Sequence, residues 1–501
     1  MMHAGTPLPG FRARGHAAGE RLRCRRARRW WVVPLLLTGA PLVAQESFGL
    51  AAHGARRAFP LNAGWEYLER DVASPAGLEP FAADWRPVEL PHSWNRFDAT
   101  DASPGYRRAA SWYRRELGVG DTAGTRYLLR FEGASITTDV FVNGRRAGGH
   151  VGGYVGFAID LTAHLRPHRR NRIEVRVDNR VDPDVIPSQK SDFFIYGGIV
   201  RDVWLEVLPT LHLDRLWIRT PQVSRAQGQV LLQVTLEGAD QLRGDAVLEA
   251  VLTAPDGRVV ARSARRLGAA AARAPLELRL PPVRRPALWS PDSPSLYRAS
   301  VRLRQGDVVL DELADRFGFR WFEFVAGGPF RLNGERLPLK GTHWHEDYAG
   351  LGAALPDSLR RGDMEKIRAM GANFVRLAHY PQDPEVYRAA DELGLLVWDE
   401  LPWCRGGIGG ESWQRHTRRL LTEQILQNRN HPSIILWSLG NEVDWLPDFP
   451  GGSDTARIDA FLRELHGLAH ALDPERLTAL RKYPGAVAIV DVFSPSIWAG
   501  W

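Results

Sequence analysis

The chain has little cysteine, with two in 501 residues. Cys24 lies in an arginine-rich N-terminal leader, so removal of that leader would leave Cys404 alone. One cysteine cannot form an internal disulfide, and the domains must therefore be stabilised by their hydrophobic cores. Cys404 has no sequence context typical of a catalytic thiol, and we interpret it as structural.

The chain also lacks net charge outside its first 30 residues. They hold eight arginines and one acid, Glu20, an excess of seven positive charges that equals the formal net charge of the whole chain. The remainder is neutral overall. This balance excludes a protein that binds nucleic acid through a basic surface.

A long hydrophobic run is missing as well. The apolar stretch Trp30–Ala44 follows the arginines and is roughly 14 residues long, which is the pattern of a secretory signal peptide and is short for a membrane span. Residues 1–44 are predicted to be a basic leader and signal peptide, with the signal at about 22–44. We therefore expect an exported protein, periplasmic or extracellular, without a stable membrane partner. The arginine pairs at 25–26 and 28–29 leave a twin-arginine route open, and an uncleaved anchor is the alternative.

Short alternating strands dominate residues 45–209. Asn143-Gly144 lies between two of them and favours a tight hairpin turn, because both residues tolerate positive φ. Regularly spaced strands without helical periodicity predict a β-sandwich or jelly roll. Residues 210–322 repeat the pattern with fewer aromatic residues, and their length suits an immunoglobulin-like β-sandwich.

From residue 323 strands alternate with helices, which is the pattern of βαβ units and a parallel sheet. The predicted strands are 337–341, 373–378, 395–399, 433–439, 477–480 and 490–495, and the predicted helices are 358–370, 383–393, 413–428 and 454–472. We interpret residues 323–501 as a (β/α)8 TIM barrel. A closed barrel needs eight strands and about six are present, so we expect a barrel that lacks its last strands.

The stretch Ser433–Glu442 organises this region. Ser433–Leu439 is mostly branched or aromatic, as in a strand that is buried on both faces, and the polar pair Asn441-Glu442 follows at once. The C-terminal strand ends of a parallel barrel form its active face, so an acid at this position is a candidate for catalysis. The ordinary alternative is that Glu442 caps the next helix.

Polar side chains follow three other predicted strands in the same way. With the pair above, the set is His345, Arg376, His379, Asp399, Asn441 and Glu442. Each has an ordinary alternative, such as a helix cap or a structural histidine. Because the strand ends meet at one face of a barrel, we expect a shared site.

At these residues the chain resembles glycoside hydrolase family 2, which includes β-galactosidases, β-glucuronidases and β-mannosidases. The resemblance covers about residues 55–501 and is carried by Lys340–Glu346, Asn373–Pro381, Trp398–Pro402, Asn428–Pro432 and Gly440–Glu442, with Trp112–Arg115 and Gly197–Val203 in the first domain. It implies a sugar-binding jelly roll, an immunoglobulin-like sandwich and a TIM barrel, in that order. It also implies a retaining β-glycosidase whose partner is an oligosaccharide or glycoside.

The resemblance implies that Glu442 is the general acid/base. In retaining glycosidases one carboxyl donates a proton to the leaving oxygen and a second, about 5–5.5 Å away, attacks the anomeric carbon. We expect the surroundings of Glu442 to hold it protonated. Asn441 would bind the sugar 2-hydroxyl, and Arg376 would orient the carboxylates.

Further substrate-binding roles follow from the same resemblance. His345 and His379 would bind sugar hydroxyls, and Asp192 of the jelly roll would reach the sugar pocket, as Asn95 would also. Asp399 and Trp498 complete the expected binding site.

The nucleophile is missing from the sequence. The family places it on a second glutamate after the seventh strand, and no acid that follows Glu442 here has that position; Asp491, for example, lies at the wrong end of the sixth strand. We expect the nucleophile in a longer parent protein and no hydrolysis by this chain alone. Ser496 and Trp498 replace the asparagine and tyrosine that are usual in the family, which leaves the sugar open.

The sequence favours β-galactosidase, because the segments His345–Asp347 and Ala378–Pro384 resemble that branch of the family more than the others. β-Glucuronidase or another family 2 glycosidase is the nearest alternative, and a catalytically inert carbohydrate-binding fragment is the alternative of another class. No cofactor is expected. Some relatives use magnesium near the acid, but no spacing of candidate ligands in this sequence indicates a divalent-metal site. The oligomeric state stays open.

Overall fold

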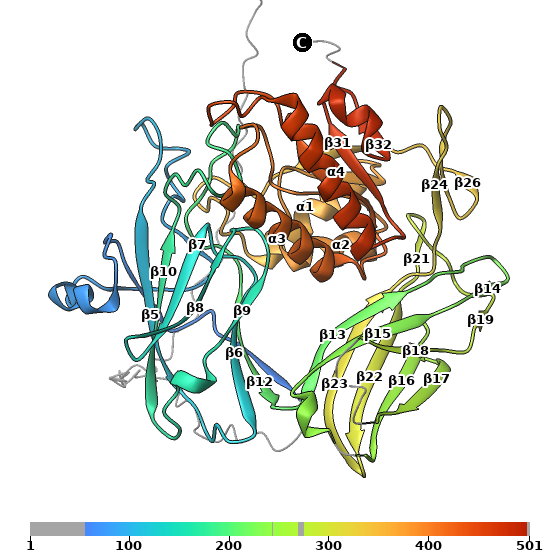
Figure 1. Cartoon of the computed structure of the whole chain (residues 1–501), viewed down its shortest axis with the longest axis horizontal. Coiled ribbons are helices and arrows are strands. Elements are labelled where there is room, and N and C mark those ends of the chain that lie inside the picture. The colour runs from blue at the N-terminus through green and yellow to red at the C-terminus, as the bar shows by residue number, and fades with distance from the viewer. Residues whose placement is uncertain (1–55, 243, 269–274, 498–501) are drawn as a thin grey trace, which may run out of the picture. The chain divides into compact units, whose positions relative to one another are not determined.

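The computed structural model describes residues 56–497, apart from 243 and 269–274 (Figure 1). The predicted leader and signal peptide at 1–44 and the predicted site residue Trp498 lie outside the described residues. The described residues belong to one compact unit, in which two antiparallel β-sandwiches are followed by a parallel sheet with helices. This arrangement confirms the predicted fold class. No helix among them is long and apolar enough to cross a membrane.

The jelly roll has two antiparallel sheets that share one core. Buried side chains from both sheets, such as Tyr113 and Val175 on one and Phe131 and Leu205 on the other, form a single apolar cluster. The first sheet has the order β1 (Arg57–Pro60), β12 (Val203–Pro209), β6 (Thr125–Phe131), β9 (Phe157–Asp160). The second has the order β3 (Arg86–Val88), β2 (Trp65–Leu68), β5 (Ala110–Gly118), β10 (Arg170–Asp178), β7 (Thr137–Val142), β8 (Arg145–Val151).

The predicted Asn-Gly hairpin joins β7 to β8. Asn143 and Gly144 have φ of 52° and 79°, the left-handed conformation that a tight hairpin turn needs. A separate short ladder pairs β4 (His92–Ser93) with β11 (Gly198–Ile199).

The immunoglobulin-like domain is a second sandwich. Its strands bury alternate residues, as the period of two in their sequences predicts, and Leu232, Leu248 and Val301 lie in its core. One sheet has the order β13 (His212–Arg219), β15 (Leu231–Glu237), β18 (Leu276–Arg279). The other has the order β17 (Val259–Arg266), β16 (Ala246–Thr253), β22 (Tyr297–Gln305), β23 (Val308–Phe317). The small ladders are β14 (Gln227–Gly228) with β19 (Val283–Arg284), β20 (Trp289–Ser290) with β21 (Ser293–Pro294), and β24 (Phe322–Phe324) with β25 (Phe330–Leu332) and β26 (Glu335–Arg336).

The third domain is a parallel sheet of six strands in sequence order. The strands are β27 (Gly341–Trp344), β28 (Phe374–Leu377), β29 (Leu396–Glu400), β30 (Ile434–Asn441), β31 (Leu477–Arg481) and β32 (Val492–Ser494), and the helices are α1 (Asp357–Ala369), α2 (Pro384–Leu393), α3 (Glu411–Asn428) and α4 (Thr455–Leu472). Figure 1 shows α4 beside β31, and the two are in contact. Every residue of β30 is buried, as its sequence predicts.

The first strand of this sheet is displaced from its predicted position. The sequence predicts 337–341, but the ladder with β28 uses Gly341–Trp344. Leu337 instead donates its N–H to the Phe330 carbonyl, and Pro338 has no N–H to offer a ladder. The strand therefore begins after these residues.

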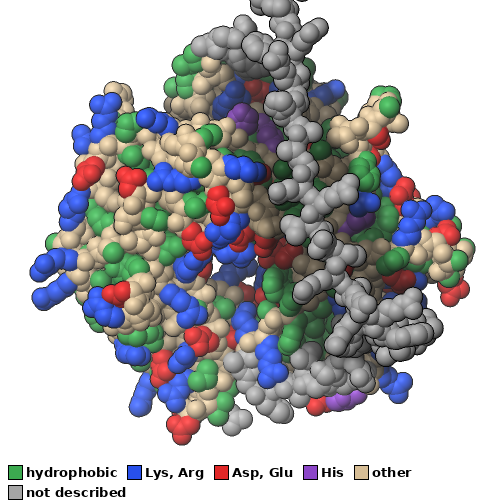
Figure 2. Space-filling model, turned by 180° about the vertical axis from the view of Figure 1, so that it is seen from behind, with side chains coloured by type: hydrophobic (Ala, Val, Ile, Leu, Met, Phe, Trp, Pro, Cys, Tyr) green, Lys and Arg blue, Asp and Glu red, His purple; other side chains and the backbone are tan. Residues whose placement is uncertain are grey.

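The surface carries charges of both signs. Figure 2 shows Lys and Arg side chains interspersed with Asp and Glu over the described part of one face. This mixture fits a chain that is neutral outside its leader.

A buried ion network ties the jelly roll to the barrel. Arg201 of the jelly roll donates to Glu346 Oε2 at 2.7 Å and to the Pro381 carbonyl at 2.8 Å, and Arg360 of α1 donates to Glu346 Oε1 at 3.0 Å. All three charged side chains are about 1% exposed or less. Burial raises the pKa of Glu346, but the two guanidinium groups outweigh it, so the pKa is lowered and the carboxylate stays ionised.

We predict that Glu346→Gln destabilises the protein. The substitution removes the carboxylate that both buried guanidinium groups share, which leaves Arg360 with Asp383 at 3.3 Å and Arg201 with backbone carbonyl groups. Removal of one member of a buried pair costs about 3–5 kcal/mol. The free energy of unfolding, measured with urea at pH 7, should fall by about that amount. Glu335→Gln is the matched control, because Glu335 pairs with Arg225 at an exposed site and should change the value by about 0.5 kcal/mol or less. Equal effects of the two substitutions would contradict the network's role.

Candidate active site

The centre of the site is the carboxylate of Glu400, at the C-terminal end of β29. Arg376 of β28 donates to it with both arms, Nε to Oε2 at 3.0 Å and Nη2 to Oε1 at 2.8 Å. His379 Nδ1 lies 2.6 Å from Oε1, and Trp398 and Ser438 donate at 2.9 and 3.1 Å. One acid thus joins the ends of β28, β29 and β30.

Glu400 is fully buried and stays charged. Burial alone would raise the pKa of this carboxyl, but the charge of Arg376 and the hydrogen bond from His379 outweigh it and lower the pKa to about 2. Glu400 is not among the site residues predicted from the sequence, which include its neighbour Asp399. Arg376 was expected to orient the catalytic carboxylates, and its ion pair is with Glu400.

Asp399 does not belong to this site. Successive side chains of a strand point to opposite faces, so Asp399 points away from the face that Glu400 occupies. Its Oδ1 accepts a hydrogen bond from the Tyr387 hydroxyl of α2 at 2.7 Å, and its Oδ2 lies 3.4 Å from Asn428 Nδ2 of α3. Burial between sheet and helices raises the pKa of Asp399 to about 6. The predicted substrate-binding role of Asp399 is therefore wrong.

Asn441 and Glu442 follow the buried strand β30 as predicted. Asn441 Oδ1 accepts hydrogen bonds from Arg376 and from Arg481, both at 3.0 Å, so it is connected directly to the Glu400 cluster. Glu442 has φ of 51°, a conformation that a non-glycine residue adopts at a local cost of about 1–3 kcal/mol. Such positions concentrate at functional sites.

Three basic side chains surround the Glu442 carboxylate. Arg405 Nε donates to Oε2 at 3.0 Å, and Lys482 Nζ and Arg481 Nη1 donate to Oε1 at 3.0 and 3.2 Å. The backbone explains their position, because the Arg405 N–H donates to the Asn441 carbonyl and the Glu442 N–H donates to the Arg481 carbonyl. These three residues were not predicted from the sequence.

The basic neighbours reverse one expectation about Glu442. The side chain is 3% exposed, and burial raises its pKa, but Lys482 and Arg405 outweigh burial and the pKa is lowered. In this structure Glu442 is a charge-paired carboxylate, whereas the sequence analysis expected surroundings that hold it protonated.

Asp192 brings the jelly roll into the site. Its Oδ2 accepts from Arg405 Nη2 at 2.7 Å, while Arg405 Nε donates to Glu442. One guanidinium therefore bridges the half-exposed Asp192 carboxylate and Glu442, which lie on two different domains. The structure thus brings Asp192 to the predicted site.

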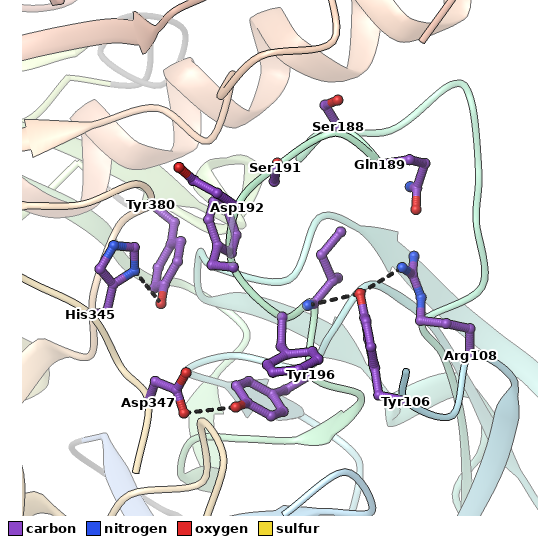
Figure 3. Close-up of a pocket in the computed structure, with 13 residues that line it drawn as sticks. Tyr106, Arg108, Ser188, Gln189, Ser191, Asp192, Tyr196, His345, Asp347 and Tyr380 are labelled. Carbon is purple, nitrogen blue, oxygen red and sulfur yellow. Dashed lines mark hydrogen bonds between the residues drawn. The ribbon is translucent and has the colours of Figure 1, made fainter. Parts of the chain in front are cut away.

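His345 lines a cavity of 570 Å³ next to this cluster, between the 188–196 segment of the jelly roll and the barrel (Figure 3). Figure 3 shows His345 directed at the Tyr380 hydroxyl, 3.4 Å from Nδ1, and Tyr196 directed at Asp347, 2.7 Å away. Burial, with His379 nearby, lowers the pKa of His345 to about 4, so its ring is neutral at pH 7. A neutral imidazole can both donate to and accept from hydroxyl groups.

Asn95 lies outside the cavity and is completely buried. Its Oδ1 accepts from the Gly197 N–H at 2.7 Å, and its Nδ2 donates to Asp98 at 2.7 Å and to the Arg107 carbonyl at 2.9 Å. The amide is occupied by the protein, because it holds the segment that ends in Gly197. Its predicted contact with substrate is therefore wrong.

One group of metal-ligating side chains lies at the site. Asp192, His379 and Cys404 offer ligand atoms within 4.8 Å of one another. Arg405 already engages Asp192 and Glu400 already engages His379, while burial raises the pKa of the Cys404 thiol. Because these side chains are already engaged by other protein groups, the contacts disfavour the binding of a metal ion at this position.

Comparison with known proteins gives the same division of the chain. Three family models match: "Glycosyl hydrolases family 2, sugar binding domain" at residues 77–209, "Glycosyl hydrolases family 2" at 211–320, and "Glycosyl hydrolases family 2, TIM barrel domain" at 324–499. Together they cover most of the chain.

Individual relatives are similar over nearly the whole chain. A protein of Formosa agariphila named "Putative beta-glucuronidase" is 50% identical over 92% of this chain, and a "Beta-galactosidase" of Thermoanaerobacter pseudethanolicus is 30% identical over 86%. The solved structure of Bacteroides uniformis beta-glucuronidase 3 is 40% identical over 89% of this chain, with a TM-score of 0.81. The chain spans 55%, 57% and 58% of these proteins, respectively.

We predict that Glu400→Gln lowers stability most at neutral pH. The folded pKa of about 2 lies below the unfolded value of about 4.3, so the stabilisation is complete above about pH 5 and is lost as the pH falls from there toward 2. The difference in the free energy of unfolding between wild type and variant should be on the order of 3 kcal/mol at pH 7 and should shrink toward pH 2. Urea unfolding at several pH values measures it.

Asp399→Asn is the matched control for this titration. The folded pKa of about 6 lies above the unfolded value of about 3.9, so wild-type stability falls as the pH rises through that interval, and the variant should lose this dependence. The two neighbouring acids thus have opposite pH effects. A Glu400→Gln profile that runs parallel to wild type would show that Glu400 is not the paired charge described here.

Proposed function

The chain belongs to glycosyl hydrolase family 2, and from this membership we propose that its parent protein is a retaining β-glycosidase that hydrolyses terminal β-glucuronides. The sequence alone favours β-galactosidase, with β-glucuronidase as the alternative, and the similarities reverse this order. The relative at 50% identity and the structure at 40% identity bear β-glucuronidase names, whereas the β-galactosidase relative is 30% identical.

The observation that supports the choice of a glucuronide is the group of basic side chains around Glu442, the candidate acid. Arg405, Arg481 and Lys482 all lie against Glu442, and Arg376 lies one residue away against Asn441. A glucuronide carries a carboxylate that galactose lacks. Positive side chains favour an anionic sugar through Coulomb attraction, which is strong in a partly buried site.

Glu442 is proposed to donate the proton to the leaving oxygen and then to activate water. Its lowered pKa in this structure is a consequence of the hydrogen bonds and charges of Lys482 and Arg405, which outweigh burial. A second carboxylate about 5–5.5 Å away would disfavour a second negative charge and raise the pKa of Glu442 toward the value that an acid needs. The proposed acid and the proposed nucleophile therefore depend on each other.

Among the described residues, the acids beside Glu442 are not suited to be that nucleophile. Glu400 is held by six hydrogen bonds from Arg376, His379, Trp398 and Ser438, and Asp192 is paired with Arg405 on another domain. We therefore propose that a part of the parent protein beyond this sequence supplies the nucleophile.

The remaining residues are proposed to bind the sugar. Asn441, whose Oδ1 accepts from Arg376 and Arg481 and whose Nδ2 lies 3.4 Å from Cys404 Sγ, is proposed to donate from Nδ2 to the 2-hydroxyl, where hydrogen bonds strengthen in the transition state. His379 uses Nδ1 for Glu400, which leaves Nε2 for a sugar hydroxyl. Neutral His345 is suited to the same task. Export through the signal peptide at 22–44 remains part of the proposal.

We predict that the parent protein prefers aryl β-glucuronides to aryl β-galactosides by at least tenfold in kcat/KM. Lys482→Gln should lower kcat/KM for the glucuronide about tenfold more than for the galactoside, because removal of a charge contact to an anionic substrate costs about 1.4 kcal/mol or more. Steady-state kinetics on both substrates measures the ratio. A higher value for the galactoside, or an equal loss on both substrates, would contradict the choice of sugar.

Two further proteins control this experiment. Glu442→Gln in the parent protein should lose hydrolysis of both substrates, which separates the acid role from the choice of sugar. The 501-residue chain alone should hydrolyse neither. Turnover by that chain would show that it contains its own second carboxylate.

A further inference from the structure

A second cluster of ligating side chains lies at the opposite end of the parallel sheet. Glu442 follows the C-terminal end of β30 and Arg481 is the last residue of β31, whereas Thr478 is near the start of β31 and Asp491 directly precedes β32. His466 and His470 are four residues apart on α4, so they lie on the same face of the helix. His466, His470 and Asp491 offer ligand atoms that lie within 4.8 Å of one another.

Hydrogen bonds fix the positions of two of these side chains, His466 and Asp491. The Thr478 hydroxyl donates its one proton to Asp491 Oδ2 at 3.0 Å, so its 2.8 Å contact with His466 Nδ1 requires that Nδ1 is the donor. In the neutral ring, Nε2 of His466 then carries the free lone pair. The Thr478 N–H also donates to Asp491 Oδ2 at 2.8 Å and fixes the carboxylate.

His470 completes the cluster. Its Nε2 lies 2.8 Å from Asp491 Oδ2, and its ring is 4.6 Å from the ring of His466, centre to centre. Both the His470 and Asp491 side chains are about 30% exposed, so the cluster is open to solvent ions.

We propose that His466, His470 and Asp491 bind a divalent transition-metal ion of the Zn²⁺ class. Two imidazoles and one carboxylate are a ligand set that zinc uses, with a water in the fourth position. Imidazole nitrogens do not suit Mg²⁺ or Ca²⁺, which prefer oxygen ligands. Ligand atoms on a tetrahedral zinc lie about 3.3 Å apart, so no pair of ligand atoms needs to close by more than about 1.5 Å, and the His470–Asp491 pair, now 2.8 Å apart, needs to open by about 0.5 Å.

The site has the outer contacts that metal-binding histidines usually have. The Nδ1–H of His466 donates to a hydroxyl, which in turn holds the carboxylate ligand, and such contacts fix the ring and the tautomer. The ion would join α4 to β31 and to the start of β32, at the end of the sheet away from the proposed catalysis. Residues at this end of a barrel serve stability. The proposal is therefore independent of the proposed function.

The 501-residue chain, without a histidine tag, tests the proposal. Isothermal titration with ZnCl₂ should show binding with a Kd in the micromolar range or below, and thermal unfolding should shift to higher temperature when Zn²⁺ is added but not when the same concentration of Mg²⁺ is added. His470→Ala should lose one equivalent of zinc, or bind it at least tenfold more weakly, and should lose the thermal shift. Asp491→Asn, which preserves the shape of the side chain, should have the same effect, and it replaces His470→Ala as the test if the alanine variant folds poorly.

Two control variants make the result specific. His168→Ala removes a histidine that pairs with Asp121 at 2.8 Å but belongs to no group of three ligating side chains among the described residues, so zinc binding should be unchanged. Cys404→Ser removes the thiol from the group of ligands at the active site and should leave the His470-dependent equivalent intact. No zinc binding by the wild type, or binding by His470→Ala and Asp491→Asn that is as tight as that of the wild type, would overturn the proposal.

Discussion

The barrel side of the site depends on one buried carboxylate, that of Glu400. A charge without exposure to water is tolerated only when its partners satisfy it fully, and here Arg376, His379, Trp398 and Ser438 all bind it. In return, the acid fixes Arg376 of β28, which then holds Asn441 at the end of β30. The position of the residue that precedes Glu442 is thus set by an ion pair between β28 and β29.

Arg405 has the corresponding role between domains. Its guanidinium contacts Asp192 of the jelly roll and Glu442 of the barrel, while the buried Arg201–Glu346–Arg360 network holds the two domains together nearby. The jelly roll therefore contributes a side chain to the site as well as support. The same guanidinium lowers the pKa of Glu442, and this effect sets a condition on the proposed chemistry: a further negative charge must be present before the group can act as an acid at neutral pH.

The sequence predicts the fold class and much of the site, because periodicity and strand ends carry that information. A period of two identifies the sandwiches, and polar residues after successive strands identify His345, Arg376, His379, Asn441 and Glu442. The choice between Asp399 and Glu400 failed, because adjacent strand residues point to opposite faces and the sequence does not fix which face is which. Asn95 and the basic neighbours of Glu442 depend on loop contacts between segments distant in sequence, such as Asn95 with Gly197, and no local pattern reports such contacts.

The proposed chemistry requires that Glu442 transfers the proton to the departing group. In the parent protein, Glu442→Ala should slow the hydrolysis of an aryl glucuronide with a poor leaving group by several orders of magnitude more than one with an activated leaving group that needs no proton. Added azide, a nucleophile that needs no general base, should restore turnover of the activated substrate and give the β-glycosyl azide as product. Equal losses on both substrates, with no rescue by azide, would contradict the account.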